Sequence, residues 1–130
     1  MPEETISRAK EFEAAWNAHD ADAVMNFFTD DAVVKLEPPP SAGGSYSGKE
    51  EIRDFVRDYI RDFHADSRDH QETEEGKVSW MSKVNAHPFG GLNPVEGIAE
   101  AVFRGDKIES FTFTFSAATL ERMEPGFAGA

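Results

Sequence analysis

The end of the chain carries the feature that most constrains its fold, a pair of alternating apolar runs joined by a very short turn. The runs extend from Val95 to Arg104 and from Lys107 to Ala117, and only Gly105-Asp106 separates them. Because glycine readily adopts the positive φ that a tight turn requires, this pattern predicts a β-hairpin. The turn also sets which side chains of the two strands share a face.

If Arg104 pairs with Lys107, Glu100 lies opposite Phe111 and Ile98 lies opposite Phe113. One face then carries a single carboxylate among apolar side chains: Ile98, Glu100, Val102, Phe111, Phe113 and Phe115. Such a carboxylate costs free energy unless it has a partner or a function, and burial raises its pKa. We therefore predict a functional site on this face. The alternatives are a strand shifted by one residue, or a solvated Glu100 paired with a nearby arginine or lysine.

Upstream of the hairpin, the spacing of apolar residues predicts helices followed by strands. The predicted elements are helices from Glu4 to His19 and from Ala21 to Phe28, a strand from Ala32 to Glu37, a helix capped by Ser47 with an apolar stripe from Ile52 to Phe63, and a strand from Lys77 to Ala86. The stretch from Ser67 to Glu75 is almost wholly polar. As a strand, it would have both faces in contact with water or partners.

Helices followed by antiparallel strands form an α+β pattern, in which the helices cover one face of a curved sheet. A helix laid across a strongly curved sheet leaves a conical cavity, so we predict a cone-shaped domain with helices packed on the concave face. The 130 residues suffice for one such domain. We assign it to residues 1–124 and expect the Gly/Ala-rich tail, residues 125–130, to be disordered.

Composition narrows the classes of partner. The net charge of −12 repels nucleic-acid phosphates and anionic membrane surfaces, although it fits equally well a simple role in solubility. The chain has no cysteine, an acidic start, and no apolar run near the ~20 residues of a membrane helix. We therefore expect a cytoplasmic protein that binds neither nucleic acid nor membrane.

The histidines carry no metal-binding pattern. His19, His64, His70 and His87 lie in four separate segments, and none forms a pair at helical spacing. We expect no metal and no cofactor.

Several motifs resemble those of the nuclear transport factor 2-like superfamily, and in particular of SnoaL-like polyketide cyclases and ketosteroid isomerases. They are WNAHDADAV (residues 16–24), FTDDAV (28–33), SGKEEIRDF (47–55), FGGLNP (89–94) and the start of the returning strand at Lys107-Ile108. The resemblance covers nearly all of the chain up to Glu124 and implies a cystatin-like roll. It does not fix the reaction, because the superfamily hosts isomerases, cyclases, epoxide hydrolases, dehydratases and inactive binding domains.

The ketosteroid isomerase pattern transfers only in part. Its general base, an acid before a proline at the end of the first strand, corresponds to Glu37, and its second acid corresponds to Glu100. The tyrosine of its first helix corresponds to Phe12, so the pair of oxyanion donors is incomplete. The acid on the last strand of limonene epoxide hydrolases corresponds to Phe113, which excludes that activity.

The candidate catalytic residues are therefore Glu100, Glu37 and His87, the last because it begins a loop that could close the cavity mouth. The predicted pocket wall is aromatic and apolar: Phe12, Trp16, Phe55, Tyr59, Trp80, Ile98, Val102, Phe111, Phe113 and Phe115. The three phenylalanines of the last strand could instead form a flat subunit interface.

We expect a pocket for a small apolar molecule, used for an isomerase- or cyclase-type proton transfer that needs no cofactor. The alternatives are a non-catalytic binding protein for such a molecule and a dimeric interaction domain. We also expect a homodimer, because the families that the chain resembles usually pair through the sheet. The uncharged face from Ser110 to Thr114 offers a surface for this contact.

Overall fold

A computed structural model describes residues 2–37, 45–87, 89 and 94–123. The predicted tail, residues 125–130, and the FGGLNP motif apart from its first and last residues lie outside this part of the chain. Among the described helices, none is long and apolar enough to cross a membrane.

The elements follow the predicted order of helices and then strands. They are α1 (Pro2–Asn17), α2 (Ala21–Asn26), β1 (Phe28–Glu37), β2 (Ser45–Ser47), α3 (Gly48–Ile60), β3 (His64–Glu74), β4 (Lys77–Asn85), β5 (Val95–Arg104), β6 (Lys107–Phe115) and α4 (Ala117–Met123). Several boundaries differ from the prediction by a few residues, and the two that matter most for the sheet are that α2 ends at Asn26 and β1 begins at Phe28. The polar stretch forms β3, and β2 and α4 were not predicted.

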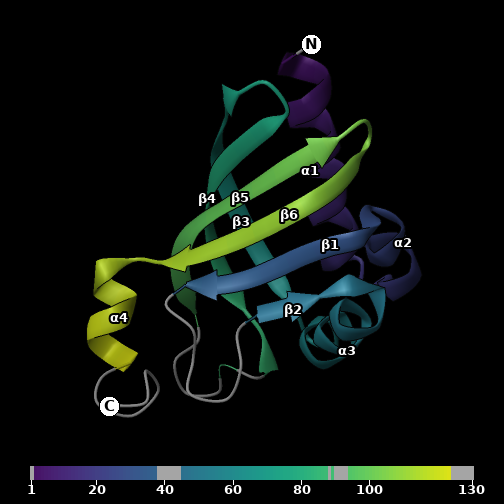
Figure 1. Cartoon of the computed structure of the whole chain (residues 1–130). Coiled ribbons are helices and arrows are strands. Elements are labelled where there is room, and N and C mark those ends of the chain that lie inside the picture. The colour runs from purple at the N-terminus through teal and green to yellow at the C-terminus, as the bar shows by residue number, and fades with distance from the viewer. Residues whose placement is uncertain (1, 38–44, 88, 90–93, 124–130) are drawn as a thin grey trace.

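The strands form one curved, open sheet in the order β2-β1-β6-β5-β4-β3, which confirms the α+β prediction. All neighbours are antiparallel except β1 and β6, which are parallel, a pairing that the prediction of a curved antiparallel sheet did not include. Helix α1 packs against β3 and β4, and α3 packs against β1 and β2. Figure 1 shows α1 behind the sheet, so the outer face of β5, β6 and β1 is turned toward the viewer.

The hairpin register is shifted by one residue from our prediction. Arg104 pairs with Lys107 as expected, but a β-bulge leaves Glu109 without a partner residue and places Val102 opposite Ser110. A bulge sets two residues against one, so it reverses which side chains share a face. Glu100 consequently lies opposite Thr112 rather than Phe111, and Ile98 lies opposite Thr114 rather than Phe113.

Small residues on β5 face the phenylalanines of β6. Ala101 lies opposite Phe111, Ala99 opposite Phe113 and Gly97 opposite Phe115. At Gly97, a Cβ atom would lie 2.3 Å from the carbonyl oxygen of Thr114 and 2.8 Å from the Phe113 ring. The rings therefore occupy space that larger side chains on β5 would fill, and this packing keeps them on the inner face.

Candidate functional site

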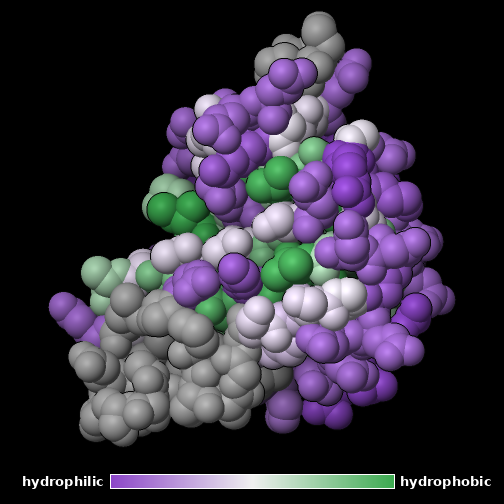
Figure 2. Space-filling model, in the orientation of Figure 1, coloured by the Kyte–Doolittle hydropathy of each residue, from purple (hydrophilic) through white to green (hydrophobic). Residues whose placement is uncertain are grey.

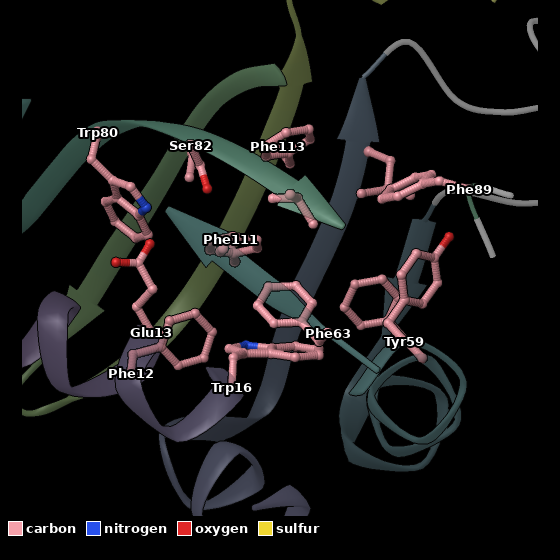
Figure 3. A pocket seen from close by; sticks show the side chains of 15 residues that line it. Phe12, Glu13, Trp16, Tyr59, Phe63, Trp80, Ser82, Phe89, Phe111 and Phe113 are labelled. Atoms are coloured by element: carbon pink, nitrogen blue, oxygen red, sulfur yellow. The ribbon is translucent and has the colours of Figure 1, made fainter. Parts of the chain in front are cut away.

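A cavity of about 60 Å³ lies between the helices and the inner face of the sheet. Its wall is mostly aromatic and aliphatic, with three polar side chains that can form hydrogen bonds beside the two indoles (Figure 3). The lining residues are Phe12, Glu13, Trp16, Leu36, Phe55, Tyr59, Phe63, Ala65, Trp80, Ser82, Val84, Phe89, Ala99, Phe111 and Phe113.

Aromatic rings in contact with one another build most of this wall. The Phe63 ring lies over Trp16, with 4.7 Å between the centroids. Tyr59 contacts Phe55 at 4.6 Å and Phe89 at 5.4 Å. Its hydroxyl bonds with Tyr46, and burial, the largest cause, together with this contact raises the pKa of Tyr59, so the phenol stays neutral.

Among the lining residues that the structure describes, Glu13 is the one carboxylate. It follows Ala9 by four residues and precedes Trp16 by three, so helical periodicity turns it toward the sheet. The Ser67 hydroxyl on β3 donates to its Oε2 atom, and the Trp80 indole also bonds to the carboxylate (Figure 3). The Glu13 side chain is 16% exposed.

The position of Glu13 depends on a link between α1 and β3. The Asn17 side-chain amide, one turn later, donates to the Ala65 carbonyl at 3.0 Å and accepts from the Ala65 N–H at 2.8 Å. An amide that satisfies both backbone groups of one residue determines how the helix lies on the strand. Asn17 therefore positions Glu13 over Ser67.

Burial raises the pKa of Glu13, and the charge of Asp66 adds to the effect. The hydrogen bonds from Ser67 and Trp80 lower the pKa but do not cancel the effect of burial. A carboxyl group with a raised pKa exchanges protons closer to neutral pH than an exposed one. This property is the one that an acid or base in an apolar cavity requires.

A second hydroxyl extends the polar cluster into the cavity. Ser82, on β4, is 7% exposed and lines the wall. Its Oγ atom lies 3.3 Å from that of Ser67, which in turn bonds to Glu13. Ser82, Ser67 and Glu13 thus form a continuous chain of hydrogen bonds that begins at the cavity.

His70 lies next to this cluster because β3 contains a bulge. Asp69 and His70 together oppose Trp80, and Asp69 has a φ of +60°, which is uncommon for a residue other than glycine. The bulge turns His70 rather than Asp69 toward the inner face, where its ring stacks on Trp80 at 5.4 Å.

The His70 side chain is 9% exposed, and its Nε2 atom lies 3.9 Å from Oε1 of Glu13. Within the described part of the chain, Nε2 has no hydrogen-bond partner. Burial is the main cause that lowers the pKa of His70, followed by the charge of Lys10, while Asp69 opposes them. The imidazole is therefore a neutral group beside the Glu13 carboxyl.

The structure places Glu100 away from the cavity, so the predicted site on its face is wrong. Its side chain is 39% exposed on the outer face of the sheet, and its carboxylate lies 3.6 Å from Nζ of Lys77. The bulge at Glu109 is the reason, because it reverses the face of β5 relative to β6. The two alternatives stated for Glu100, a shift of one residue in the strand and pairing with a nearby basic residue, are both observed.

The other two candidate catalytic residues also lie outside the cavity wall. Glu37 is half-buried at the end of β1, opposite Thr114. His87 is exposed, its backbone N–H donates to Asp62 at 2.9 Å, and its ring Nδ1 lies 4.0 Å from the same carboxylate. The cavity brings none of the three candidates together.

Seven of the ten predicted wall residues line the cavity: Phe12, Trp16, Phe55, Tyr59, Trp80, Phe111 and Phe113. Ile98 and Val102 lie on the outer face, where the bulge puts them, and Ile98 is 52% exposed. Phe115 is buried but packs behind the wall against Phe113 and Phe89.

The predicted site did not include Glu13 and Ser82 on the wall, or Ser67 and His70 of β3, which lie next to them. The spacing of Glu13 from Ala9 and Trp16 was a usable signal, since all three share a helix face. No described group of His, Asp and Glu side chains is arranged to hold a metal ion.

The chain belongs to the SnoaL-like domain family, whose model matches residues 9–111. No curated protein matches the sequence. This family assignment agrees with the resemblance seen in the motifs of the helices and the hairpin.

Solved structures share the fold at low sequence identity. Bal32a, from a soil-derived mobile gene cassette, has a TM-score of 0.77 and 18% identity over 89% of this chain and 92% of its own. SalBIII, an epoxide hydrolase/cyclase-like enzyme in pyran ring formation in the polyether salinomycin, has a TM-score of 0.74 and 13% identity over 90% of this chain and 94% of its own. An uncharacterised cystatin-fold protein from Novosphingobium aromaticivorans has a TM-score of 0.66 and 27% identity over 84% of this chain and 96% of its own.

Proposed function

We propose that this protein binds a small, largely apolar molecule in the aromatic cavity and that Glu13 moves a proton to or from it. The observation that carries the proposal is the Glu13 carboxyl, which has a raised pKa and is the one carboxylate among the described residues of a mostly aromatic and aliphatic wall. Proton transfer by a positioned carboxyl group needs no cofactor. The reaction would be of the isomerase or cyclase type.

The surroundings of Glu13 suit this role. Ser67 and Trp80 hold the carboxylate, which limits its rotation, and the aromatic rings keep water away from it. A carboxylate with few water contacts is a stronger base than one in solution. SalBIII, a structural neighbour with a cyclase-like activity, supports a reaction of this class on the same fold.

The size of the cavity limits the ligand. A volume of about 60 Å³ is well below the ~150 Å³ of an apolar cavity that holds benzene, so even a single ring requires the wall to open. Phe63 is a half-buried wall residue that contacts Trp16 at 4.7 Å between ring centroids, and its rotation would open the wall. We therefore expect a ligand built around one ring, or one end of a longer molecule.

Binding can be tested through tryptophan fluorescence, because the two tryptophans of the chain, Trp16 and Trp80, both line the cavity. Titration with toluene should change the emission of both residues and saturate. If the emission does not change and calorimetry detects no heat, the cavity does not bind apolar molecules and the proposal is wrong.

Proton transfer can be tested with 5-nitrobenzisoxazole, whose ring opens to a coloured phenolate when a base removes its C–H proton. The wild type should accelerate this reaction, and Glu13→Gln should abolish the acceleration while Glu100→Gln, on the outer face, should retain it. Binding of toluene without acceleration would leave the alternative, a non-catalytic binding protein. Equal rates for the two variants would exclude Glu13 as the base.

We also propose that the protein forms a homodimer through the outer face of the sheet. Met81 and Ile98 are 41% and 52% exposed there, next to the uncharged strand residues Thr112 and Thr114. Figure 2 shows apolar side chains in the middle of this face with hydrophilic ones around them. Light scattering at micromolar concentration should give a dimer that Ile98→Lys disrupts and Ala18→Lys, on the helical side, does not. A monomeric wild type would refute the proposal.

A further inference from the structure

We propose that the polar end of the cavity selects its ligand through a hydrogen-bond donor, a hydroxyl group that faces Glu13 and Ser82. The inference rests on the proposed function only in taking the cavity as the ligand site. It follows from where each polar hydrogen of the cluster points.

The Ser67 hydroxyl has one hydrogen, and it is committed to Glu13. Ser67 must therefore accept in its contact with Ser82 at 3.3 Å, so the Ser82 hydroxyl is the donor. Once this hydrogen is used, Ser82 presents only lone pairs to the cavity that it lines. The ionised carboxylate of Glu13 thus sets the donor direction of both hydrogen bonds.

The carboxylate itself also presents acceptors alone. An ionised carboxylate has about four lone-pair positions, and Ser67 and Trp80 occupy two of them. His70, at 3.9 Å, is too far to donate directly. The Trp16 indole N–H, which is also on the wall, takes no part in this group of hydrogen bonds.

A ligand hydroxyl placed here would donate to Glu13 or Ser82, so its own hydrogen would keep a partner inside the cavity. A ketone oxygen in the same place would face lone pairs only. It would give up its hydrogen bonds to water on binding and form none in the cavity to replace them. A charged amine would meet the carboxylate but would also enter an apolar cavity whose described wall residues include no other charged group. The wall and the cluster together therefore favour a neutral alcohol or phenol.

The test compares cyclohexanol with cyclohexanone, which have similar size and differ in the donor. Their affinities can be measured at pH 8.5, to keep Glu13 ionised, from the indole N–H signals of Trp16 and Trp80 in NMR titrations. A hydrogen bond to a charged acceptor predicts that the alcohol binds about 10- to 100-fold more tightly. A ketone that binds as tightly as the alcohol would overturn the inference and leave the binding function intact.

Glu13→Gln should reverse the preference. The NH₂ group of glutamine adds a donor to this end of the cavity, and a ketone oxygen can accept from it. Glu100→Gln is the matched control and should keep the wild-type preference. The same loss of preference in both variants, or no change in Glu13→Gln, would show that the cluster does not select the ligand.

Ser82→Ala provides a second variant if Glu13→Gln does not fold. It removes one acceptor from the cavity wall, so it should weaken the binding of cyclohexanol several-fold and leave that of cyclohexanone unchanged. An equal effect on the two ligands would overturn the role of Ser82. If neither ligand binds to the wild type, both the inference and the proposed function fail.

Discussion

Replacing Glu13 with glutamine removes one ionisation from the interior and should change how stability depends on pH. Burial raises the folded pKa of Glu13 above its ordinary value, so the folded state holds the proton more tightly than the unfolded state. The contribution of Glu13 to the free energy of unfolding is therefore complete below the unfolded pKa. It is lost as the pH rises from the unfolded pKa to the folded pKa. Glutamine keeps the shape of the side chain and cannot ionise, so the variant lacks this fall.

The size of the effect follows from the pKa difference. Each unit by which the folded pKa exceeds the unfolded one corresponds to about 1.4 kcal/mol of stability lost between acid and neutral pH. In a domain of this length, about 1 kcal/mol shifts the melting temperature by about 3–5 °C. The difference in melting temperature, variant minus wild type, should therefore increase from pH 4 to pH 8.

The assay is a pair of melting curves recorded by circular dichroism across this pH range, with Glu100→Gln as the control. Glu100 is partly exposed and paired with Lys77, so its variant should show no comparable increase. If the curves of the wild type and of Glu13→Gln run parallel from acid to neutral pH, Glu13 titrates like a surface carboxylate. The catalytic assignment would then fail.

Further predictions concern the residues around the cavity. Burial lowers the folded pKa of His70, so the wild type should lose stability as the pH falls through the ordinary histidine pKa. His70→Phe keeps a ring against Trp80 but cannot ionise, so its melting curves at acid pH should lack this loss. Phe113→Ala removes a ring that is 5% exposed and should destabilise the fold by about 3–5 kcal/mol, as urea midpoints at constant slope would show. Gly97→Ala should cost about 1–3 kcal/mol in the same assay, because its Cβ atom would lie 2.3 Å from the Thr114 carbonyl oxygen; an unchanged midpoint would contradict this close packing.

Local patterns predicted most of the elements. The apolar spacing in α1 and α3 and the glycine turn between β5 and β6 are short-range signals, since each depends on residues that are close in sequence. They also placed Phe111 and Phe113 on the inner face, and the structure has both on the cavity wall. The polar strand β3 was harder to interpret, because its inner side chains meet the Glu13 cluster rather than an apolar core.

The prediction of Glu100 failed because strict alternation was counted from the turn. The bulge at Glu109 inserts one residue, and a single inserted residue reverses every later pair. A stronger signal was the small series Gly97, Ala99 and Ala101. These residues leave room for the large rings of β6, which is a reason to place the two series on one face.

The sequence by itself determined helices α1 to α3, the hairpin turn and the aromatic character of a cavity, because periodicity and turn chemistry act over a few residues. Only the tertiary structure decided which carboxylate reaches that cavity. Glu13 meets Ser67 across 54 residues of chain, and the contact depends on how Asn17 holds α1 on β3 and on how the bulge at Asp69 sets the inner face of that strand. Such a long-range contact leaves no periodic trace in the sequence, because its geometry exists only once the helix has packed on the sheet.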